Sequence, residues 1–320
     1  MNALPVRRGL VGLASAAVLA AALTSGALAP AAGATAPAAA AAGVCGTATT
    51  PPPTHFDHVV LLIFENKDQD QILSGTAAPY LKALSEQCGR GTDMNTPDPL
   101  TSLANYIALT SGYTGHPKHI TANRGPTAWP QDSVSIFEQL GSDWTELAEN
   151  AKGNCYTSNA AFNFTVDHTP APYYTRIKAA CLAHDIPMGP TPDLSAAFTL
   201  LSPNKSHIMH EDDAPGTTTQ AQRIKAGDDW AAGYLPKVFA SPEYQAGRTA
   251  VIITWDEGTA KRNDVPFIVA SPYTPPGYTT NVFMTHYSTL KGMEQMLGLP
   301  LLGHAGDAGV ASIRDYFGLS

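Results

Sequence analysis

Residues 249–255 read Thr-Ala-Val-Ile-Ile-Thr-Trp and run directly into Asp256-Glu257-Gly258. Five of these seven residues are β-branched, which favours a strand buried on both faces of a sheet over a helix. Two adjacent carboxylates at the end of such a strand cannot both stay ionised without a partner. In open α/β sheets, ligands bind at this edge, outside the carboxyl ends of the strands. The pair Asp256-Glu257 is therefore either a solvated acidic turn or half of a metal site.

A second apolar segment ends in polar side chains in the same way. Residues 58–64 (HVVLLIF) predict another buried strand, and Glu65-Asn66 follow it. Ser102 falls in the first turn of a helix predicted over 101–111, where free backbone N–H groups favour an anion. We expect all of these polar groups to project from the same carboxyl edge of one sheet.

Together these groups form an oxygen-rich set, which suits a hard or borderline divalent cation. The members of the predicted metal site are Glu65, Asn66, Ser102, Asp256 and Glu257. Oxygen ligands alone do not distinguish calcium, magnesium, manganese and iron. A metal ion beside a serine hydroxyl lowers the pKa of that hydroxyl, which would make Ser102 a nucleophile without a histidine base.

Strands and helices alternate along the rest of the chain. Further strands are predicted over 144–148, 196–201 and 265–270, helices over 78–88, 133–140, 220–239 and 286–297, and an irregular excursion over 153–192. This alternation predicts an α/β fold with a mainly parallel central sheet and helices on both faces.

The N-terminus has the pattern of an export signal. Arg7-Arg8 precede an uncharged run rich in Ala, Leu and Val, and the run ends in Ala32-Gly33-Ala34, an A-x-A cleavage pattern. We expect a signal peptide over 1–34, a disordered linker over 35–50 and a single domain over 51–320. The product would be secreted or held in the cell envelope. No later segment predicts stable insertion into a membrane.

The chain is acidic and contains four cysteines. Residues 1–34 hold two of its 19 basic residues and none of its 27 acidic ones, so the remainder carries a formal charge of −10. This charge argues against nucleic-acid binding and makes a bound cation useful for attracting an anionic substrate. No C-x-x-C pair is present, which favours disulfides over metal ligation in an exported protein. Of the three possible pairings, proximity in sequence favours Cys45–Cys88 and Cys155–Cys181.

The chain resembles the bacterial phosphoesterase family of secreted acid phosphatases and nonspecific phospholipases C, which has the alkaline-phosphatase-like fold. Seven stretches carry the resemblance in family order: HVVLLIFEN (58–66), APYLKAL (78–84), SLANYIALTSG (102–112), PNKSHIMHED (203–212), AGDDWAAGYLPKVFASPEY (226–244), VIITWDEG (251–258) and HYSTLKGMEQMLGLPLLGHA (286–305). The resemblance implies that residues 51–320 form one phosphoesterase domain that hydrolyses phosphate esters or phospholipids.

Roles for the polar residues at the sheet edge follow from the same resemblance. One divalent metal ion would be bound, and Ser102 would both touch it and attack phosphorus to form a phosphoseryl intermediate. The other implied ligands of the metal are Glu65, Asn66, Asp256 and Glu257. Some relatives use threonine as the nucleophile, and the usual His-Pro before the serine is Leu100-Thr101 here, so Thr101 remains an alternative.

Histidines supply the remaining implied roles. His168 and His210 would hydrogen-bond phosphate oxygens or protonate the leaving group, because histidine changes its charge near working pH. The family's Asp before Met-His is replaced by isoleucine here, which leaves His207 open as an alternative to His210. Asn105 would position the phosphate or the turn before the helix, and His286 would line the pocket or cap its helix.

The predicted activity is that of a secreted, metal-dependent phosphomonoesterase of the acid phosphatase type. The chain ends soon after the helix over 286–297, without the additional C-terminal domains of the longer phospholipase relatives. Short secreted members of the family resemble acid phosphatases, including ones that act on phosphoinositides. A phospholipase C that hydrolyses phospholipid head groups, and a non-catalytic binding protein on the same fold, are the alternatives.

Overall fold

The computed structural model describes residues 43–159, 163–210, 216–259 and 263–320. The predicted signal peptide lies outside these residues. Among the helices in this part of the chain, none is both long and apolar enough to cross a membrane.

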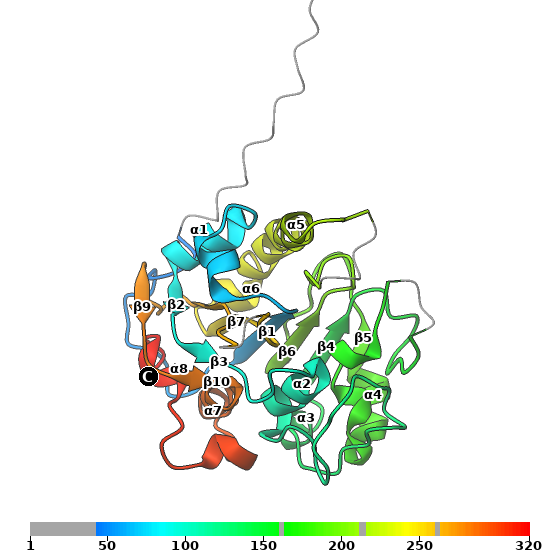
Figure 1. The fold of residues 1–320 in the computed structure, drawn as a ribbon. Coiled ribbons are helices and arrows are strands. Elements are labelled where there is room, and N and C mark those ends of the chain that lie inside the picture. Colours follow the sequence, from blue (N-terminus) through cyan, green and yellow to red (C-terminus); the bar gives the residue numbers. More distant parts are fainter. Residues whose placement is uncertain (1–42, 160–162, 211–215, 260–262) are drawn as a thin grey trace, which may run out of the picture. The chain divides into compact units, whose positions relative to one another are not determined.

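A central sheet of eight strands organises the domain (Figure 1). Its spatial order is β5 (Asp185–Pro187), β4 (Trp144–Ala148), β6 (Phe198–Ser202), β1 (His58–Phe64), β7 (Thr249–Trp255), β8 (Phe267–Ala270), β2 (Gly89–Gly91) and β9 (Tyr278–Thr280). A separate pair is formed by β3 (Met94–Asn95) and β10 (Met284–Thr285).

The strand directions confirm the predicted mainly parallel sheet. β1 pairs in parallel with both β6 and β7, and β4 continues the parallel run through β6 to β5. β8 runs antiparallel to its neighbours β7 and β2. The centre of the sheet is therefore built from the two apolar segments that end in acidic side chains.

Helices cover both faces of this sheet, as predicted. They are α1 (Pro79–Gln87), α2 (Ser102–Ser111), α3 (Ile136–Leu140), α4 (Lys178–His184), α5 (Gln220–Phe239), α6 (Pro242–Gln245), α7 (His286–Leu297) and α8 (Ile313–Tyr316). α1 packs against α5 on one face, and α2 packs against α7 on the other (Figure 1). Shorter 3-10 and π turns lie at Asp70–Ser74, Val166–His168, Ala171–Tyr173, Thr175–Ile177 and Gly303–Gly306.

Two segments are more ordered than the sequence predicts. The excursion over 153–192 contains α4 and the edge strand β5, because a short amphipathic segment gains its stability from packing rather than from a visible periodicity. Residues 43–50, expected in the disordered linker, belong to the domain: Val44 and Cys45 are buried, and Cys45 is bonded to Cys88.

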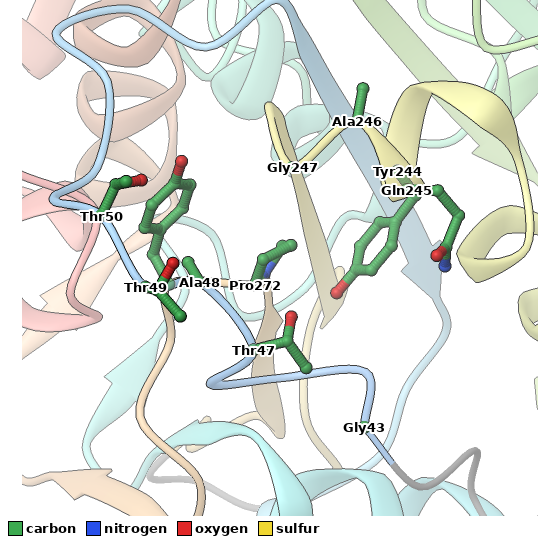
Figure 2. A pocket seen from close by; sticks show the side chains of 11 residues that line it. Gly43, Thr47, Ala48, Thr49, Thr50, Tyr244, Gln245, Ala246, Gly247 and Pro272 are labelled. Atoms are coloured by element: carbon green, nitrogen blue, oxygen red, sulfur yellow. The ribbon is translucent and has the colours of Figure 1, made fainter.

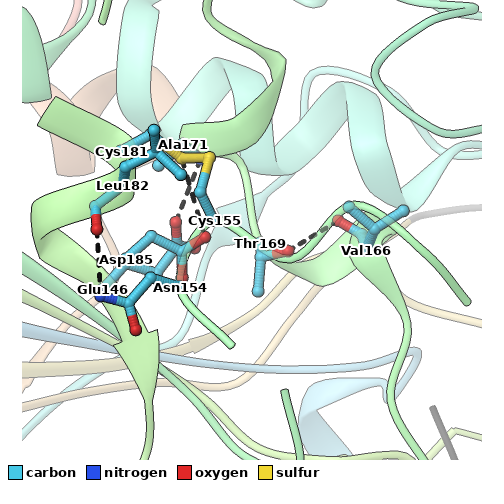
Figure 3. Close-up of a disulfide and its surroundings, with 9 residues drawn as sticks. All are labelled: Glu146, Asn154, Cys155, Val166, Thr169, Ala171, Cys181, Leu182 and Asp185. Carbon is cyan, nitrogen blue, oxygen red and sulfur yellow. Dashed lines mark hydrogen bonds between the residues drawn. A yellow bond between two sulfur atoms is a disulfide. The ribbon is translucent and has the colours of Figure 1, made fainter. Parts of the chain in front are cut away.

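The structure confirms both predicted disulfides, Cys45–Cys88 and Cys155–Cys181. The second one closes over a pair of buried carboxyl groups (Figure 3). Glu146 on β4 is the register partner of Asp185 on β5, and both side chains are buried. One oxygen of Glu146 accepts a hydrogen bond from the backbone N–H of Ala171 at 3.1 Å. Because the two carboxyl groups are adjacent and shielded from water, ionising both of them is energetically unfavourable.

The Glu146–Asp185 pair predicts a stability that depends on pH. Burial, and then the charge of Asp185, raises the pKa of Glu146 well above its usual range, and burial raises the pKa of Asp185 to about 8. The folded protein thus keeps protons that the unfolded chain releases above about pH 4. The stabilisation is complete in acid and is lost as the pH rises towards about 8.

Melting temperatures of the wild type and of Glu146→Gln, measured from pH 5 to pH 8, test this expectation. Glutamine keeps the acceptor for Ala171 and removes the charge, so the variant should lose less melting temperature over this range than the wild type does. Each kcal/mol corresponds to about 2–4 °C in a large domain. Glu86→Gln, at an exposed position on α1, is the matched control. Equal slopes for the wild type and Glu146→Gln would contradict the assignment.

Candidate functional site

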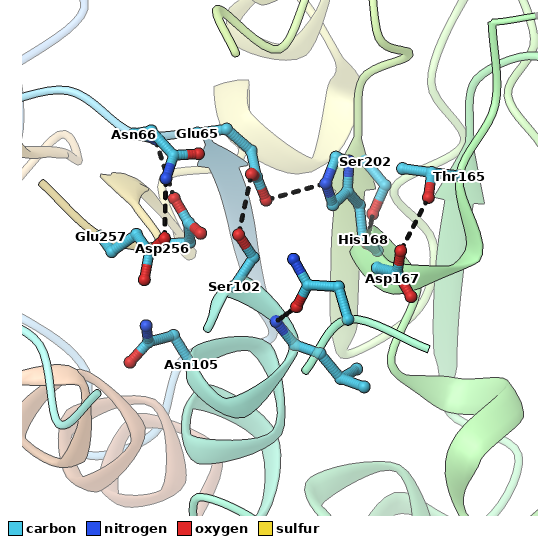
Figure 4. A network of polar contacts seen from close by, with 12 residues as sticks. Glu65, Asn66, Ser102, Asn105, Thr165, Asp167, His168, Ser202, Asp256 and Glu257 are labelled. Atoms are coloured by element: carbon cyan, nitrogen blue, oxygen red, sulfur yellow. Dashed lines mark hydrogen bonds and ion pairs between the residues drawn. The ribbon is translucent and has the colours of Figure 1, made fainter. Parts of the chain in front are cut away.

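The pairing of β1 with β7 brings the two acidic strand ends together (Figure 4). Phe64 is the register partner of Trp255, and the N–H of Asp256 donates to the Phe64 carbonyl at 2.9 Å. Glu65-Asn66 and Asp256-Glu257 therefore leave adjacent parallel strands at the same carboxyl edge, as predicted.

Asn66 links the two strand ends directly. Its backbone N–H donates to Asp256 Oδ1 at 3.0 Å, and its side-chain Nδ2 donates to Glu257 Oε1 at 2.7 Å. The residue has a φ of 46°, in the left-handed region that asparagine tolerates better than most residues. A strained backbone that crosslinks two carboxylates fits a site where geometry matters for function.

Ser102 begins α2 and faces this cluster. Its hydroxyl donates to Glu65 Oε2 at 3.0 Å, and the side chain is only 2% exposed. Thr101, the alternative nucleophile, is the N-cap residue, and its side chain makes no capping hydrogen bond. Its backbone N–H instead lies near the carboxylate of Glu257 and contributes to lowering the pKa of that group, against the larger effect of burial. Between the two hydroxyls, Ser102 is the one hydrogen-bonded to a predicted metal ligand.

His168 closes the far side of the cluster. Its Nε2 lies 3.0 Å from Glu65 Oε1, and its ring stacks on Tyr106 of α2, with centroids 5.5 Å apart. Glu65 is thus held between the Ser102 hydroxyl and the His168 imidazole, as Figure 4 shows. Nothing in the pattern of the helix predicted over 101–111 pointed to this stacking role of Tyr106.

The two alternative histidines separate in the structure. His210 is near enough to Glu65 to help lower the pKa of that carboxyl group, after the larger effects of burial, which raises it, and of His168. His207 hydrogen-bonds the carboxylate of Glu149 at 2.9 Å and stacks on Trp230. These contacts place His207 in a different network, and we retain His210 as the candidate.

The carboxyl groups of the cluster are buried and repel one another, and both effects disfavour their ionised forms. Burial raises the pKa of Asp256 well above its usual range, and the charges of Glu65 and Glu257 add to this. Burial and the charge of Glu65 also raise the pKa of Glu257 to about 8. For Glu65, burial acts in the same direction but is outweighed by the charge and hydrogen bond of His168, so its pKa is lowered. A cation would relieve the repulsion.

Three buried oxygens in the cluster have neither a hydrogen-bond partner nor an ion-pair partner among the described residues: Asn66 Oδ1, Asp256 Oδ2 and Glu257 Oε2. Buried polar atoms are normally satisfied, so a missing partner is expected here. All three are hard oxygen ligands, and they come from residues predicted to bind metal. The donor set therefore fits a divalent cation.

The three carboxylates of the cluster are spaced more widely than the ligands of a closed metal site. In the described part of the chain, the group of His, Cys, Asp or Glu ligand atoms found within 4.8 Å of one another is Cys155, Cys181 and Asp185, whose sulfurs form a disulfide. The ligand atoms of Glu65, Asp256 and Glu257 do not meet that spacing. A cation among them would have to pull at least one carboxylate inward.

His286 and Asn105, both considered as substrate-binding residues, make hydrogen bonds to backbone groups beside the site. His286 is fully buried and donates from Nε2 to the Asp256 carbonyl at 2.7 Å; burial lowers its pKa to about 4 despite this hydrogen bond. Asn105 is also fully buried, and its amide bonds both the N–H and the carbonyl of Asp98. In the structure both side chains hold backbone groups beside the site, which favours the positioning role that the sequence left open for each.

Asp98 is a further residue that sequence reasoning missed. Its charge contributes to raising the pKa of Glu257, and its Oδ2 lies 2.9 Å from His119 Nε2. The surrounding Pro-Asp-Pro turn has no periodicity that would have pointed to the site. Only the fold brings this turn beside Glu257.

A cavity of about 350 Å³ lies at the other end of β7 (Figure 2). It is lined by residues of the 43–50 segment, of the stretch 244–247 before β7, and by Pro272 and Tyr273. Its lining contains no histidine and no carboxylate. Because β7 separates it from Asp256, this cavity is not part of the candidate site.

Comparisons with known proteins identify relatives of the chain. The model of the phosphoesterase family matches residues 96–300. A phosphatidylinositol-3-phosphatase of Mycobacterium tuberculosis is 26% identical over 271 residues, which cover 82% of this chain and 84% of that protein.

Solved structures share the fold. A protein of the alkaline phosphatase superfamily from Vibrio parahaemolyticus matches with a TM-score of 0.52 and 12% identity, over 83% of this chain and 74% of that one. A phosphonate monoester hydrolase from Silicibacter pomeroyi matches with a TM-score of 0.51 and 12% identity, over 82% and 76%. These two matches confirm the alkaline-phosphatase-like fold.

Proposed function

The chain belongs to the phosphoesterase family and is a phosphoric ester hydrolase, and we propose that it is an exported, metal-dependent phosphomonoesterase that works through a phosphoserine on Ser102. The observation that carries the proposal is the hydrogen bond from the Ser102 hydroxyl to Glu65, inside a cluster of three buried carboxylates. A buried serine hydroxyl that faces a carboxylate is placed to lose its proton and act as a nucleophile.

The metal ion would be held by Glu65, Asn66, Asp256 and Glu257, with the Ser102 hydroxyl beside it. The three buried oxygens without partners support this ligand set. When bound, the ion supplies positive charge that lowers the pKa of the hydroxyl and offsets the charge of the phosphoryl group.

The residues of the chain then account for the proton movements. The Ser102 proton passes to Glu65 Oε2 as the Oγ–phosphorus bond forms and the bond to the leaving oxygen breaks. His210 donates a proton to that oxygen. Water then attacks phosphorus and gives its proton to His210, the bond to Oγ breaks, and Ser102 recovers its proton from Glu65. His168, paired with Glu65 at 3.0 Å, keeps this carboxylate ionised at the start.

Substrate class and location are supported by two further observations. The curated relative from Mycobacterium tuberculosis is a phosphatidylinositol-3-phosphatase, which favours a phosphomonoester over the diester that a phospholipase C cleaves. The N-terminal export pattern and the two disulfides support export to an oxidising compartment. The presence of Ser102 within the carboxylate cluster disfavours a non-catalytic binding protein.

A substrate panel tests the proposed activity. The purified chain, incubated with a divalent metal, should release phosphate from p-nitrophenyl phosphate and from phosphatidylinositol 3-phosphate. It should release no phosphocholine from phosphatidylcholine. Phosphocholine release without phosphomonoesterase activity would establish the phospholipase C alternative. Inactivity on all three substrates with every metal would favour the binding protein.

A further inference from the structure

The Cys155–Cys181 disulfide packs against the buried carboxyl group of Asp185 (Figure 3). Cys181 Sγ lies 3.9 Å from Asp185 Oδ2, and the backbone N–H of Cys155 donates to the Asp185 carbonyl at 2.9 Å. Both sulfurs and one oxygen of Asp185 lie within 4.8 Å of one another. The fold thus gathers three potential metal ligands at one point, from the loop after β4, from α4 and from the start of β5.

Glu146 on β4 adds a fourth potential ligand. It is fully buried and is the register partner of Asp185 on the neighbouring strand, so the two side chains leave the sheet on the same face. Its Oε2 accepts the hydrogen bond from Ala171, whereas its Oε1 has no hydrogen-bond partner in the part of the chain that the structure describes. Buried polar atoms are normally satisfied, so this oxygen is available to a proton or to a cation. The Glu146 side chain would have to move towards the sulfurs to complete a set of four, because it is not in the 4.8 Å group.

The redox state of the two cysteines decides whether this set can hold a metal ion. The form of cysteine that binds metal is the thiolate, and a disulfide offers none. A phosphine reductant gives two electrons to the S–S bond and becomes a phosphine oxide, while water supplies the oxygen atom and the two thiol protons. Two thiolates with carboxylate oxygens are ligands that zinc accepts in tetrahedral sites. Zinc binding then releases the protons of the thiols and of the carboxyl groups.

A cavity gives a reductant access to the disulfide. Its volume is about 440 Å³, and its lining includes Cys155 together with Lys178 and Leu182 of α4. Cys155 is half-buried, whereas Cys181 and Asp185 are buried. A small reductant can therefore attack the Cys155 sulfur from the cavity, while the side of the cluster that faces the sheet stays shielded from water.

From this arrangement we propose that reduction of the Cys155–Cys181 disulfide creates a zinc site whose ligands are both thiolates, Asp185 and Glu146. The site lies at the edge strand β5, whereas the carboxylate cluster of the candidate active site follows the central strands β1 and β7. The disulfide and the zinc ion are alternative links between the loop after β4, α4 and β5. The disulfide serves in an oxidising compartment, and zinc holds the same segments together where thiols stay reduced.

Titration of the full-length chain with cobalt(II) tests the proposal, because cobalt–thiolate bonds give charge-transfer absorption that oxygen ligands do not give. After reduction with a phosphine, the wild type should develop this band, and added zinc should abolish it. The unreduced protein should show no such band. Cys155→Ser/Cys181→Ser should show none after reduction either, although it keeps Cys45 and Cys88. Asp185→Asn should weaken zinc binding by at least about 10-fold, and Asp229→Asn, at an exposed position on α5, should bind as the wild type.

Thermal melts of the reduced protein give a second readout. Zinc should raise the melting temperature of the reduced wild type by more than it raises that of reduced Cys155→Ser/Cys181→Ser, in which only the carboxylate cluster of the active site can respond. If reduction unfolds the chain, zinc should restore its circular dichroism spectrum. A reduced wild type with no thiolate band, a band that persists in the double serine variant, or zinc affinity unchanged in Asp185→Asn would each overturn the proposed ligand set.

Discussion

Ser102→Ala is expected to lower kcat/KM for a phosphomonoester by about 10³-fold or more, because it removes the atom that attacks phosphorus. The hydroxyl is buried at the start of α2 and hydrogen-bonded to Glu65. The change removes one oxygen at a helix start and should leave the fold intact. Steady-state kinetics and a thermal melt on the same preparation measure both effects.

Thr101→Ala is the matched control for this prediction. Its side chain makes no capping hydrogen bond, and its backbone contact with Glu257 survives the substitution. We expect its kcat/KM to stay within about tenfold of the wild type, since the side chain makes no capping hydrogen bond that could be lost. Activity that survives in Ser102→Ala and disappears in Thr101→Ala would reassign the nucleophile to the threonine.

Removal of the metal ion should have the second large effect. Chelation is expected to reduce activity by at least about 100-fold, because a catalytic cation contributes several kcal/mol to the transition state. Adding back calcium, magnesium, manganese or iron one at a time should restore activity and identify the ion. Binding at about 100 times Kd should also stabilise the fold by about 2.7 kcal/mol.

The variant Asp256→Asn tests whether the metal ion binds at the carboxylate cluster. Asp256 is fully buried beside two other carboxylates, so the chelated variant should melt no lower than the chelated wild type. It should, however, lose both activity and the rise in melting temperature on metal addition. Asp229→Asn, at an exposed position on α5, should behave as the wild type. A normal metal response in Asp256→Asn would remove Asp256 from the ligand set.

Much of the site could be predicted because strand ends are readable in the sequence. The apolar segments before Glu65 and Asp256 have the length and β-branching of buried strands, and parallel strands place their carboxyl ends at one edge. The structure adds their direct adjacency and the register of Phe64 with Trp255. Strand order depends on long-range packing, which no local pattern contains.

Other features depend on the direction of a strand or the orientation of a side chain, and the sequence shows neither. The apolar residues of β8 predict a strand equally well in either orientation, so its antiparallel pairing was not foreseen. Asn105 and His286 lie on the expected helices, but their side chains face Asp98 and the Asp256 backbone rather than a substrate.

Trapping of the covalent intermediate tests the central claim most directly. The metal-supplied enzyme should be mixed with a phosphomonoester, quenched with acid within one turnover, and digested for peptide mass spectrometry. The account predicts phosphate on Ser102 in the wild type and no phosphopeptide in Ser102→Ala. Turnover by the wild type with phosphate on Thr101, on a histidine, or on no residue at all would contradict it.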